Sequence, residues 1–155
     1  MNRMILLPVA MLAACGAFLP MEGTWNLDTM EVTQNDCTDP GTDTGTDTGT
    51  DTSEPQTMTV ALGEGDAFTM QLPDADAANC TLSGHDFTCE PVVGSGGAGG
   101  TTIDTTTTIT GSFADESNVD ISFTTDIACT GDGCAMMGMP ATCTMAGTAT
   151  ASMPM

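Results

Sequence analysis

The feature that most constrains the fold of this chain is an alternation of apolar with polar or small residues beyond residue 57. It runs through residues 58–62, 68–72, 103–113 and 119–129. A two-residue period turns one face of each segment toward a core and the other toward solvent, which is typical of β-strands. Threonine, whose branched side chain suits such a surface, occurs 29 times. We therefore expect an all-β fold.

Turn residues between these segments predict which strands pair and in which register. Gly65, the Gly84–His85 step and residues 114–118 each join two apolar runs, so we expect the chain to fold back at each of them. The register follows because the apolar faces of both strands must coincide. The predicted opposed pairs are Val60 with Met70, Leu62 with Phe68, Cys80 with Cys89, Leu82 with Phe87, Ile109 with Phe123, and Phe113 with Val119.

The number of strands favours a closed architecture. A last strand over residues 142–151 is rich in small residues, and pairing its Cys143 with Cys129 sets Ala149 opposite Phe123. Small residues opposite large ones fill the interior of a narrow barrel. We expect residues 23–155 to form a small antiparallel up-and-down barrel of about eight strands, with the Gly-rich residues 94–100 as a flexible connector. A two-sheet β-sandwich is the alternative.

Residues 38–55 interrupt this pattern. They hold three Gly-Thr-Asp-Thr repeats and no aliphatic or aromatic side chain, so burial cannot offset the entropy of ordering them, and we expect a disordered acidic loop. Calcium binding needs roughly six to eight oxygen atoms converging on one point, and aspartates spaced every four residues lack that pattern. We expect a solvated spacer rather than a calcium site. The aspartates are Asp39, Asp43, Asp47 and Asp51.

Charge excludes several classes of function. The chain has 21 acidic residues, one histidine and a single lysine or arginine, Arg3. Nucleic-acid binding draws its affinity from lysine and arginine on phosphates, so we expect no nucleic-acid partner. An arginine clamp for carboxylate or phosphate ligands and a lysine Schiff base are excluded for the same reason.

The first 15 residues resemble the signal of bacterial lipoproteins. Arg3 precedes an apolar run of about ten residues, shorter than the roughly 20 that a membrane-spanning helix needs. The run ends in Leu12-Ala13-Ala14-Cys15, which resembles the lipobox. The resemblance implies that residues 1–14 are a cleaved signal peptide and that Cys15 carries the lipid anchor. Residues 15–22 would then be the anchor and tether.

The same resemblance predicts a location in the bacterial cell envelope. Gly16, rather than aspartate, follows Cys15, which favours the outer membrane. A free stretch of seven residues after the cysteine would reach at most about 23–25 Å, so we expect the domain to sit close to the membrane surface. The alternative is an ordinary cleaved signal peptide, with Cys15 a plain thiol.

Six further cysteines form an even set, which in an exported chain predicts three disulfides. Cys80–Cys89 has the strongest support, because the two residues are predicted to lie opposite each other in a hairpin. The predicted register of the last hairpin pairs Cys129 with Cys143. Cys37 and Cys134 are then left to pair with each other. A zinc site is the alternative, which the absence of any Cys-x-x-Cys pair disfavours, and we expect no metal or cofactor. The set is Cys37, Cys80, Cys89, Cys129, Cys134 and Cys143.

Gly23-Thr24-Trp25 on the first strand resembles the Gly-x-Trp motif of lipocalins and related eight-stranded barrels. The resemblance implies a tryptophan that plugs the closed end of a barrel. The chain departs from that family because it has no tyrosine and no arginine that could pack over Trp25. If the barrel holds a cavity for a small apolar ligand, we expect Trp25, Phe68, Ile109 and Phe123 to line it.

Two other groups of residues suggest chemistry. His85 and Asp86 with nearby Ser83 could serve a nucleophile, but all three fall in one predicted turn, where we expect an exposed polar hairpin. Methionine thioethers suit Cu(I), although methionine also fills gaps in cores. The two methionine clusters are Met136-Met137-Gly138-Met139 and Met153-Pro154-Met155.

The sequence therefore favours a monomeric, non-enzymatic, membrane-anchored envelope lipoprotein. It would bind a small apolar ligand or act as a surface or structural module. The alternatives are a protein-interaction module without an internal site and an envelope binder of copper or calcium.

Overall fold

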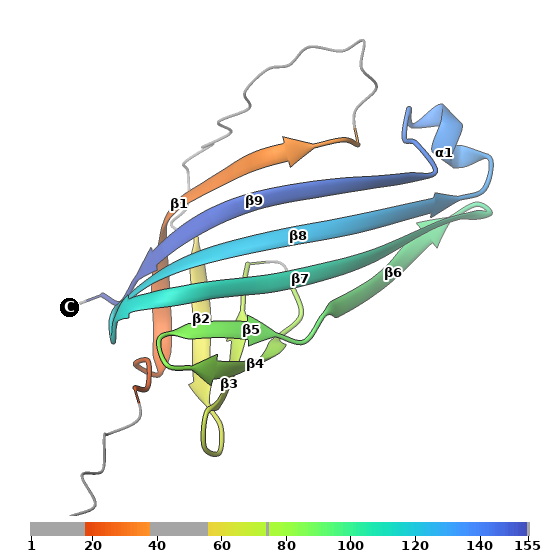
Figure 1. Cartoon of the computed structure of the whole chain (residues 1–155). Helices are drawn as coiled ribbons and strands as arrows, with labels where there is room; N and C mark the ends of the chain where they lie inside the picture. Colours follow the sequence, from red (N-terminus) through yellow and green to blue (C-terminus); the bar gives the residue numbers. More distant parts are fainter. Residues whose placement is uncertain (1–17, 38–55, 74, 155) are drawn as a thin grey trace, which may run out of the picture.

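The computed structural model describes residues 18–37, 56–73 and 75–154, which form nine strands and one short helix (Figure 1). No helix in these ranges is long and apolar enough to cross a membrane. The elements are β1 (Gly23–Asn35), β2 (Thr57–Leu62), β3 (Ala67–Gln71), β4 (Ala78–Ser83), β5 (Asp86–Cys89), β6 (Val92–Ala98), β7 (Thr101–Asp115), β8 (Asn118–Thr130), α1 (Gly133–Met136) and β9 (Thr142–Ser152).

One antiparallel sheet contains all nine strands and closes into a ring. The strand order is β5-β4-β3-β2-β1-β9-β8-β7-β6, and an additional pairing between β5 and β7 closes it. Strands β5 and β6 share the same edge of β7: β5 pairs with Thr110–Ser112, and β6 pairs with Thr101–Thr107. Eight strands therefore form the ring, which confirms the up-and-down barrel and leaves no role for the sandwich alternative.

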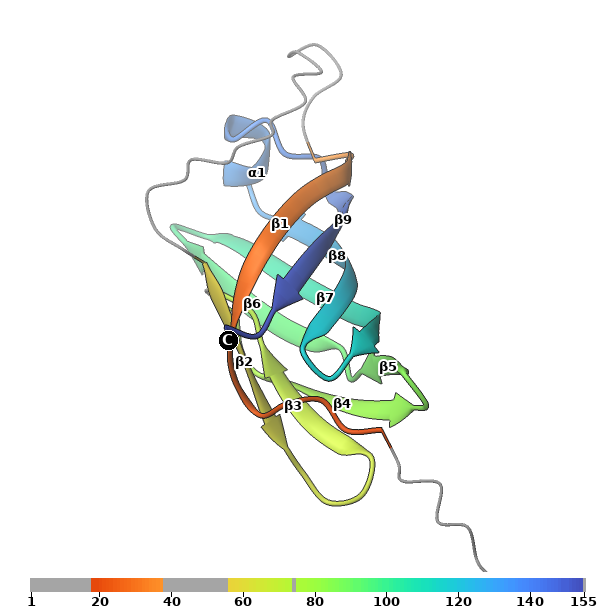
Figure 2. The same cartoon turned by 90° about the vertical axis from the view of Figure 1, so that its left-hand side faces the viewer.

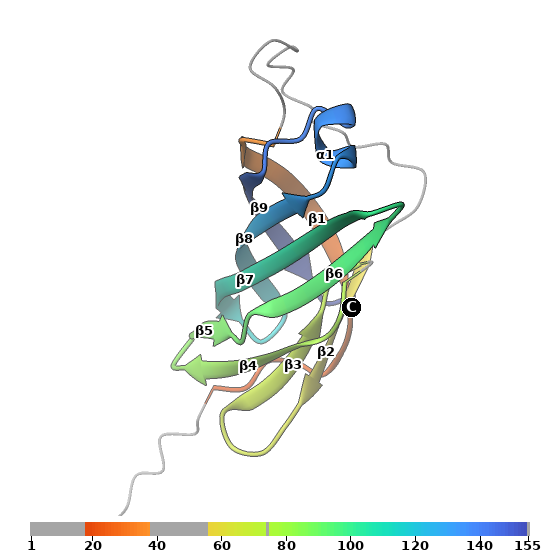
Figure 3. The same ribbon diagram turned by 90° about the vertical axis from the view of Figure 1, so that its right-hand side faces the viewer.

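The barrel is uneven because its strands differ in length. Strands β2 to β5 have only 4 to 6 residues, whereas β1, β7, β8 and β9 have 11 to 15. The ring is complete only at the end where the short strands lie. Beyond it, the long strands and β6 continue as a curved five-stranded sheet, and none of the strands in the described ranges lies opposite it (Figures 2 and 3). We call these two parts the closed half and the open half.

The hydrophobic core fills the closed half. Phe113 lies at its centre, with its ring centroid 5.9 Å from those of Trp25 and Phe68 and 5.3 Å from that of Phe87. Each of these side chains is at most 3% exposed. Aromatic pairs at such separations, most of them edge to face, add to the stabilisation that burial provides.

The local hairpins confirm the registers that the turns predict. All six predicted opposed pairs occur as partners in the sheet. The prediction of a flexible Gly-rich connector over residues 94–100 is wrong, because residues 94–98 belong to strand β6. A two-residue turn at Gly99 and Gly100, both with positive φ, folds this strand back onto β7.

The register predicted for the last hairpin is also wrong, by two residues. Cys143 lies opposite Ile127 rather than Cys129, and Phe123 lies opposite Gly147 rather than Ala149. A shift of two leaves every side chain on its predicted face, so the alternation cannot distinguish the two registers. The observed register places a residue without a side chain against the largest ring of β8.

Gly147 tests this explanation. A Cβ atom there would lie 2.5 Å from Cζ of Phe123 and 2.5 Å from the carbonyl oxygen of Glu31. We expect Gly147→Ala to lower the free energy of unfolding by about 1–3 kcal/mol, since the ring and the backbone must both shift. The measurement is denaturant unfolding.

The matched control is Gly96→Ala on β6. Gly96 also lies in a strand, but a Cβ atom there would have no neighbour within 4 Å. We expect its effect to stay within about 0.5 kcal/mol. Equal destabilisation by both substitutions would contradict the explanation.

Candidate functional site

The inner face of the open half is the candidate site. Directly paired residues of neighbouring strands point to the same face of a sheet, so the pairing extends the inner face of the barrel into the open half. Because none of the described strands lies opposite this face, the sheet leaves it uncovered, and we call it the trough. It is lined by Met30, Val32, Ile103, Thr105, Thr107, Phe123, Thr125, Ile127 and Met145.

Exposure of apolar side chains in the trough is greatest on β1, at its edge. Ile109, in the core, is 3% exposed, and its partner Phe123 is half-buried. Two apolar side chains of β1, Met30 and Val32, are 40% and 47% exposed. The floor between them and α1 mixes half-buried threonines with Ile127 and Met145. The trough is thus a largely apolar surface that the described residues do not cover.

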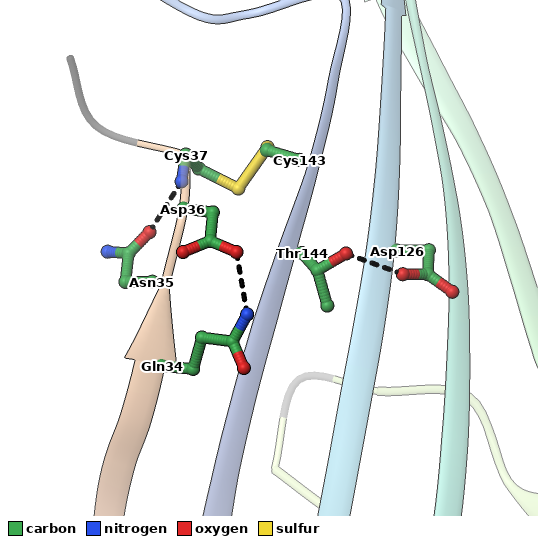
Figure 4. Close-up of a disulfide and its surroundings, with 7 residues drawn as sticks. All are labelled: Gln34, Asn35, Asp36, Cys37, Asp126, Cys143 and Thr144. Atoms are coloured by element: carbon green, nitrogen blue, oxygen red, sulfur yellow. Dashed lines mark hydrogen bonds between the residues drawn. A yellow bond between two sulfur atoms is a disulfide. The ribbon is translucent and has the colours of Figure 1, made fainter. Parts of the chain in front are cut away.

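A disulfide fixes the edge of the trough that β1 forms. Cys37, just beyond β1, is bonded to Cys143 of β9 (Figure 4). The backbone N–H of Asp36 donates to the carbonyl of Thr144 at 3.0 Å, and the side chain of Asn35 accepts from the N–H of Cys37 at 3.0 Å. The disulfide and the bond from Asp36 hold the end of β1 against β9, although beyond Leu27 no described residue pairs with the other edge of β1.

Helix α1 closes the far end of the trough. Cys134 in this helix is bonded to Cys129 at the end of β8. The N–H of Gly133 also donates to Oγ1 of Thr101, at the start of β7. The loop between β8 and β9 is therefore fastened to two strands of the trough floor.

Two of the three predicted disulfide pairings are wrong. Cys80–Cys89 is confirmed, with the two residues directly paired between β4 and β5. Cys129 bonds to Cys134 and not to Cys143, because α1 folds Cys134 back onto the end of β8. Cys143 is therefore free to bond with Cys37, which lies on the adjacent strand.

The outer face of the open half is acidic and polar. Neutral groups hydrogen-bond its carboxylates: Thr144 donates to Asp126 at 2.8 Å, Gln34 to Asp36 at 2.6 Å, and Ser95 to Asp104 at 2.6 Å. The described ranges contain no lysine or arginine. These three aspartates line one shallow depression, and no group of metal-ligating carboxylate, histidine or cysteine side chains is found among the described residues.

Residues 18–22 cross the opposite end of the molecule, over the mouth of the closed half (Figure 2). Phe18 stacks on His85 at a centroid distance of 4.1 Å and lies 5.6 Å from Phe113. The indole N–H of Trp25 donates to the carbonyl of Met21 at 3.1 Å. We call residues 18–22 the strap and this end of the barrel the closed end.

Asp115 shapes the turn between β7 and β8 at the closed end. Its carboxylate accepts hydrogen bonds from the backbone N–H and hydroxyl of Ser117 and from the side chain of Asn118. These bonds, the backbone one foremost, hold the pKa of Asp115 below its ordinary value. The backbone carbonyl of the next residue, Glu116, accepts a hydrogen bond from the N–H of Met21 at 3.0 Å. The ordered turn therefore helps to fix the strap.

Most of the residues proposed to line a cavity are buried in the hydrophobic core of the closed half. Trp25, Phe68 and Ile109 lie in the packed core, and only Phe123 reaches the trough. The sequence pattern did not identify Met30, Val32 or Met145 as residues of an exposed inner face. Alternation from Trp25 and Leu27 would turn Met30 and Val32 outward, and the β-bulge between Leu27 and Thr29 that turns them inward becomes visible only in the structure.

The other candidate groups do not form sites in the described structure. His85 bonds through Nδ1 to the carbonyl of Phe113 at 2.9 Å, and its ring stacks on Phe18. It has no hydrogen bond to Ser83 or Asp86 among the described contacts. The methionine clusters lie at opposite ends: Met136 and Met137 are exposed at α1, whereas Met153 packs against the core of the closed half. Asp39, Asp43, Asp47, Asp51, Cys15 and Met155 lie outside the described residues.

The sequence matches no protein-family model, and comparisons with curated proteins and with solved structures give no match. Any function must therefore be inferred from the sequence and geometry of this chain.

The disulfide pattern gives a direct test. We expect the double variant Cys37→Ala/Cys143→Ala to lose more stability than Cys129→Ala/Cys134→Ala, because the two bonds span 106 and 5 residues. Chain entropy alone puts the larger loss at about 4–5 kcal/mol. Denaturant unfolding measures the losses, and non-reducing peptide mapping checks the pairings. Recovery of a Cys37–Cys134 peptide would contradict the structure.

Proposed function

We propose that this protein is a non-enzymatic lipoprotein of the bacterial envelope, anchored through Cys15, whose trough binds an apolar ligand. The sequence Leu12-Ala13-Ala14-Cys15 supports the anchor. Three disulfides fit an oxidising compartment outside the cytoplasm and agree with export. Two or three acyl chains on one cysteine suffice for stable attachment to a bilayer.

The exposed apolar side chains of the trough carry the proposal of binding. Val32, Met30 and the half-buried Phe123 lie on a concave face, where contact with an apolar molecule would remove their surface from water. Threonine hydroxyls at positions 105, 107 and 125 add polar groups that can orient such a ligand. The core of the closed half is filled by aromatic rings, so we place the ligand in the trough and not inside the barrel.

A second candidate is a protein-interaction module. The outer edge of β6 and the edge of β1 beyond Asn26 have no partner strand among the described residues. Such edges can accept an extended segment of another protein. Native mass spectrometry of the protein purified from its own membranes separates the two candidates, because one predicts a retained small molecule and the other a retained polypeptide.

The anchor is tested with Cys15→Ser. We expect the wild-type protein to partition with membranes and to have an intact mass above that of residues 15–155 by its acyl chains. The serine variant should stay in the aqueous phase, since an oxygen nucleophile replaces the thiol that is acylated. A wild-type mass without acyl chains would contradict the anchor.

The trough is tested with a neutral apolar dye, Nile red, because the strongly acidic chain repels anionic dyes. We expect Val32→Asn to weaken binding of the dye severalfold, since it places an amide among the apolar side chains of the trough. Fluorescence titration measures the affinity.

Val93→Asn is the matched control. Val93 is 69% exposed and lies on β6 between the inward-facing Val92 and Gly94, so its side chain points outward. This variant should bind the dye as the wild type does. Equal loss in both variants, or no binding by the wild type, would count against the trough.

A further inference from the structure

The strap fixes the start of the described chain to the closed end of the barrel. Phe18 packs between His85 and Phe113, and the buried Pro20 follows it. Met21 is held on both sides, by its N–H to Glu116 and by its carbonyl from Trp25. Residues 18–22 are therefore part of the barrel and do not act as a free tether.

This attachment shortens the link to Cys15. Seven residues separate Cys15 from β1, but only three peptide steps separate it from Phe18. Three residues span at most about 10–11 Å, less than half the reach of a seven-residue tether. A lipid on Cys15 would hold the closed end within this distance of the bilayer surface.

We propose that the closed end of the barrel lies against a lipid surface, with the strap between them, and that the trough and α1 stand away from the membrane. The inference rests on the proposed acylation of Cys15. It assigns the strap as the membrane-contact surface, which the lipobox alone does not specify.

The exposed side chains of the strap suit this position. Leu19 and Met21 are 41% and 46% exposed, whereas Phe18 packs against the core and Pro20 is buried. The carboxylates of Glu22, Asp115 and Glu116, in the strap and in the turn that holds it, are exposed to solvent at the same end of the barrel. Charged groups at this end make deep insertion costly, so we expect contact at the level of the lipid headgroups.

The length of the strands sets how far the trough extends from the membrane. Strand β7 runs 15 residues from the closed end to the turn beside α1. At about 3.3 Å per residue it measures roughly 50 Å, although its tilt shortens the height above the surface. The far end of the trough would then be accessible to ligands or partners in the surrounding compartment.

The test uses the absence of lysine from the whole chain. A single introduced lysine can be labelled with an amine-reactive nitrobenzoxadiazole dye, and the wild-type protein reports any background at the terminal amine. The two variants are Glu116→Lys, at the closed end, and Met136→Lys, on α1; both native side chains are exposed. The acylated proteins, residues 15–155, are reconstituted in phosphatidylcholine vesicles. One set of vesicles contains lipids that carry a nitroxide quencher near the headgroup, and the other does not.

We expect the quencher to remove most of the fluorescence at position 116 and little of it at position 136. Equal quenching at both positions, stronger quenching at 136, or none at 116 would overturn the orientation while leaving the anchor intact. A chain that has no acyl mass and does not float with vesicles would overturn the anchor and this inference together. Mass spectrometry of the same samples tells the two failures apart.

Discussion

The shared edge of β7 determines the shape of this protein. Strand β5 pairs with one end of it and closes the ring, while β6 pairs with the other end and leaves the sheet open. A backbone edge can pair with only one strand at each position, so the step from β5 to β6 is the point where the barrel stops being closed. The packed core, the trough and the separation of the two ends all follow from this division.

Local pairing could be predicted from the sequence because each hairpin has its turn and both its apolar faces within a few residues. Val60 with Met70 and Phe113 with Val119 are examples. The last hairpin could not be placed, because the loop holding α1 separates its strands and a shift of two residues preserves the faces. The partner of Cys37 could not be predicted either, since it depends on α1 folding Cys134 back onto Cys129 and so leaving Cys143 available.

The trough shows a second limit of sequence patterns. Val32 and Ile121 are both aliphatic residues on the inner face of the sheet, yet one is 47% exposed and the other 1%. The difference depends on whether short strands lie opposite, which is a property of the whole ring. Exposure of apolar residues, the main indication of a binding surface here, therefore becomes visible only in three dimensions.

The disulfide between Cys37 and Cys143 also has a mechanical consequence. Tension applied through the strap enters β1 at Gly23. It then acts along the length of the strand, beside its antiparallel neighbour β9. Pulling β1 lengthwise loads its hydrogen bonds to β9 together rather than one at a time, and the covalent bond at its far end prevents the strand from sliding out. A protein held at its closed end and loaded at its trough would thus resist force along its long axis.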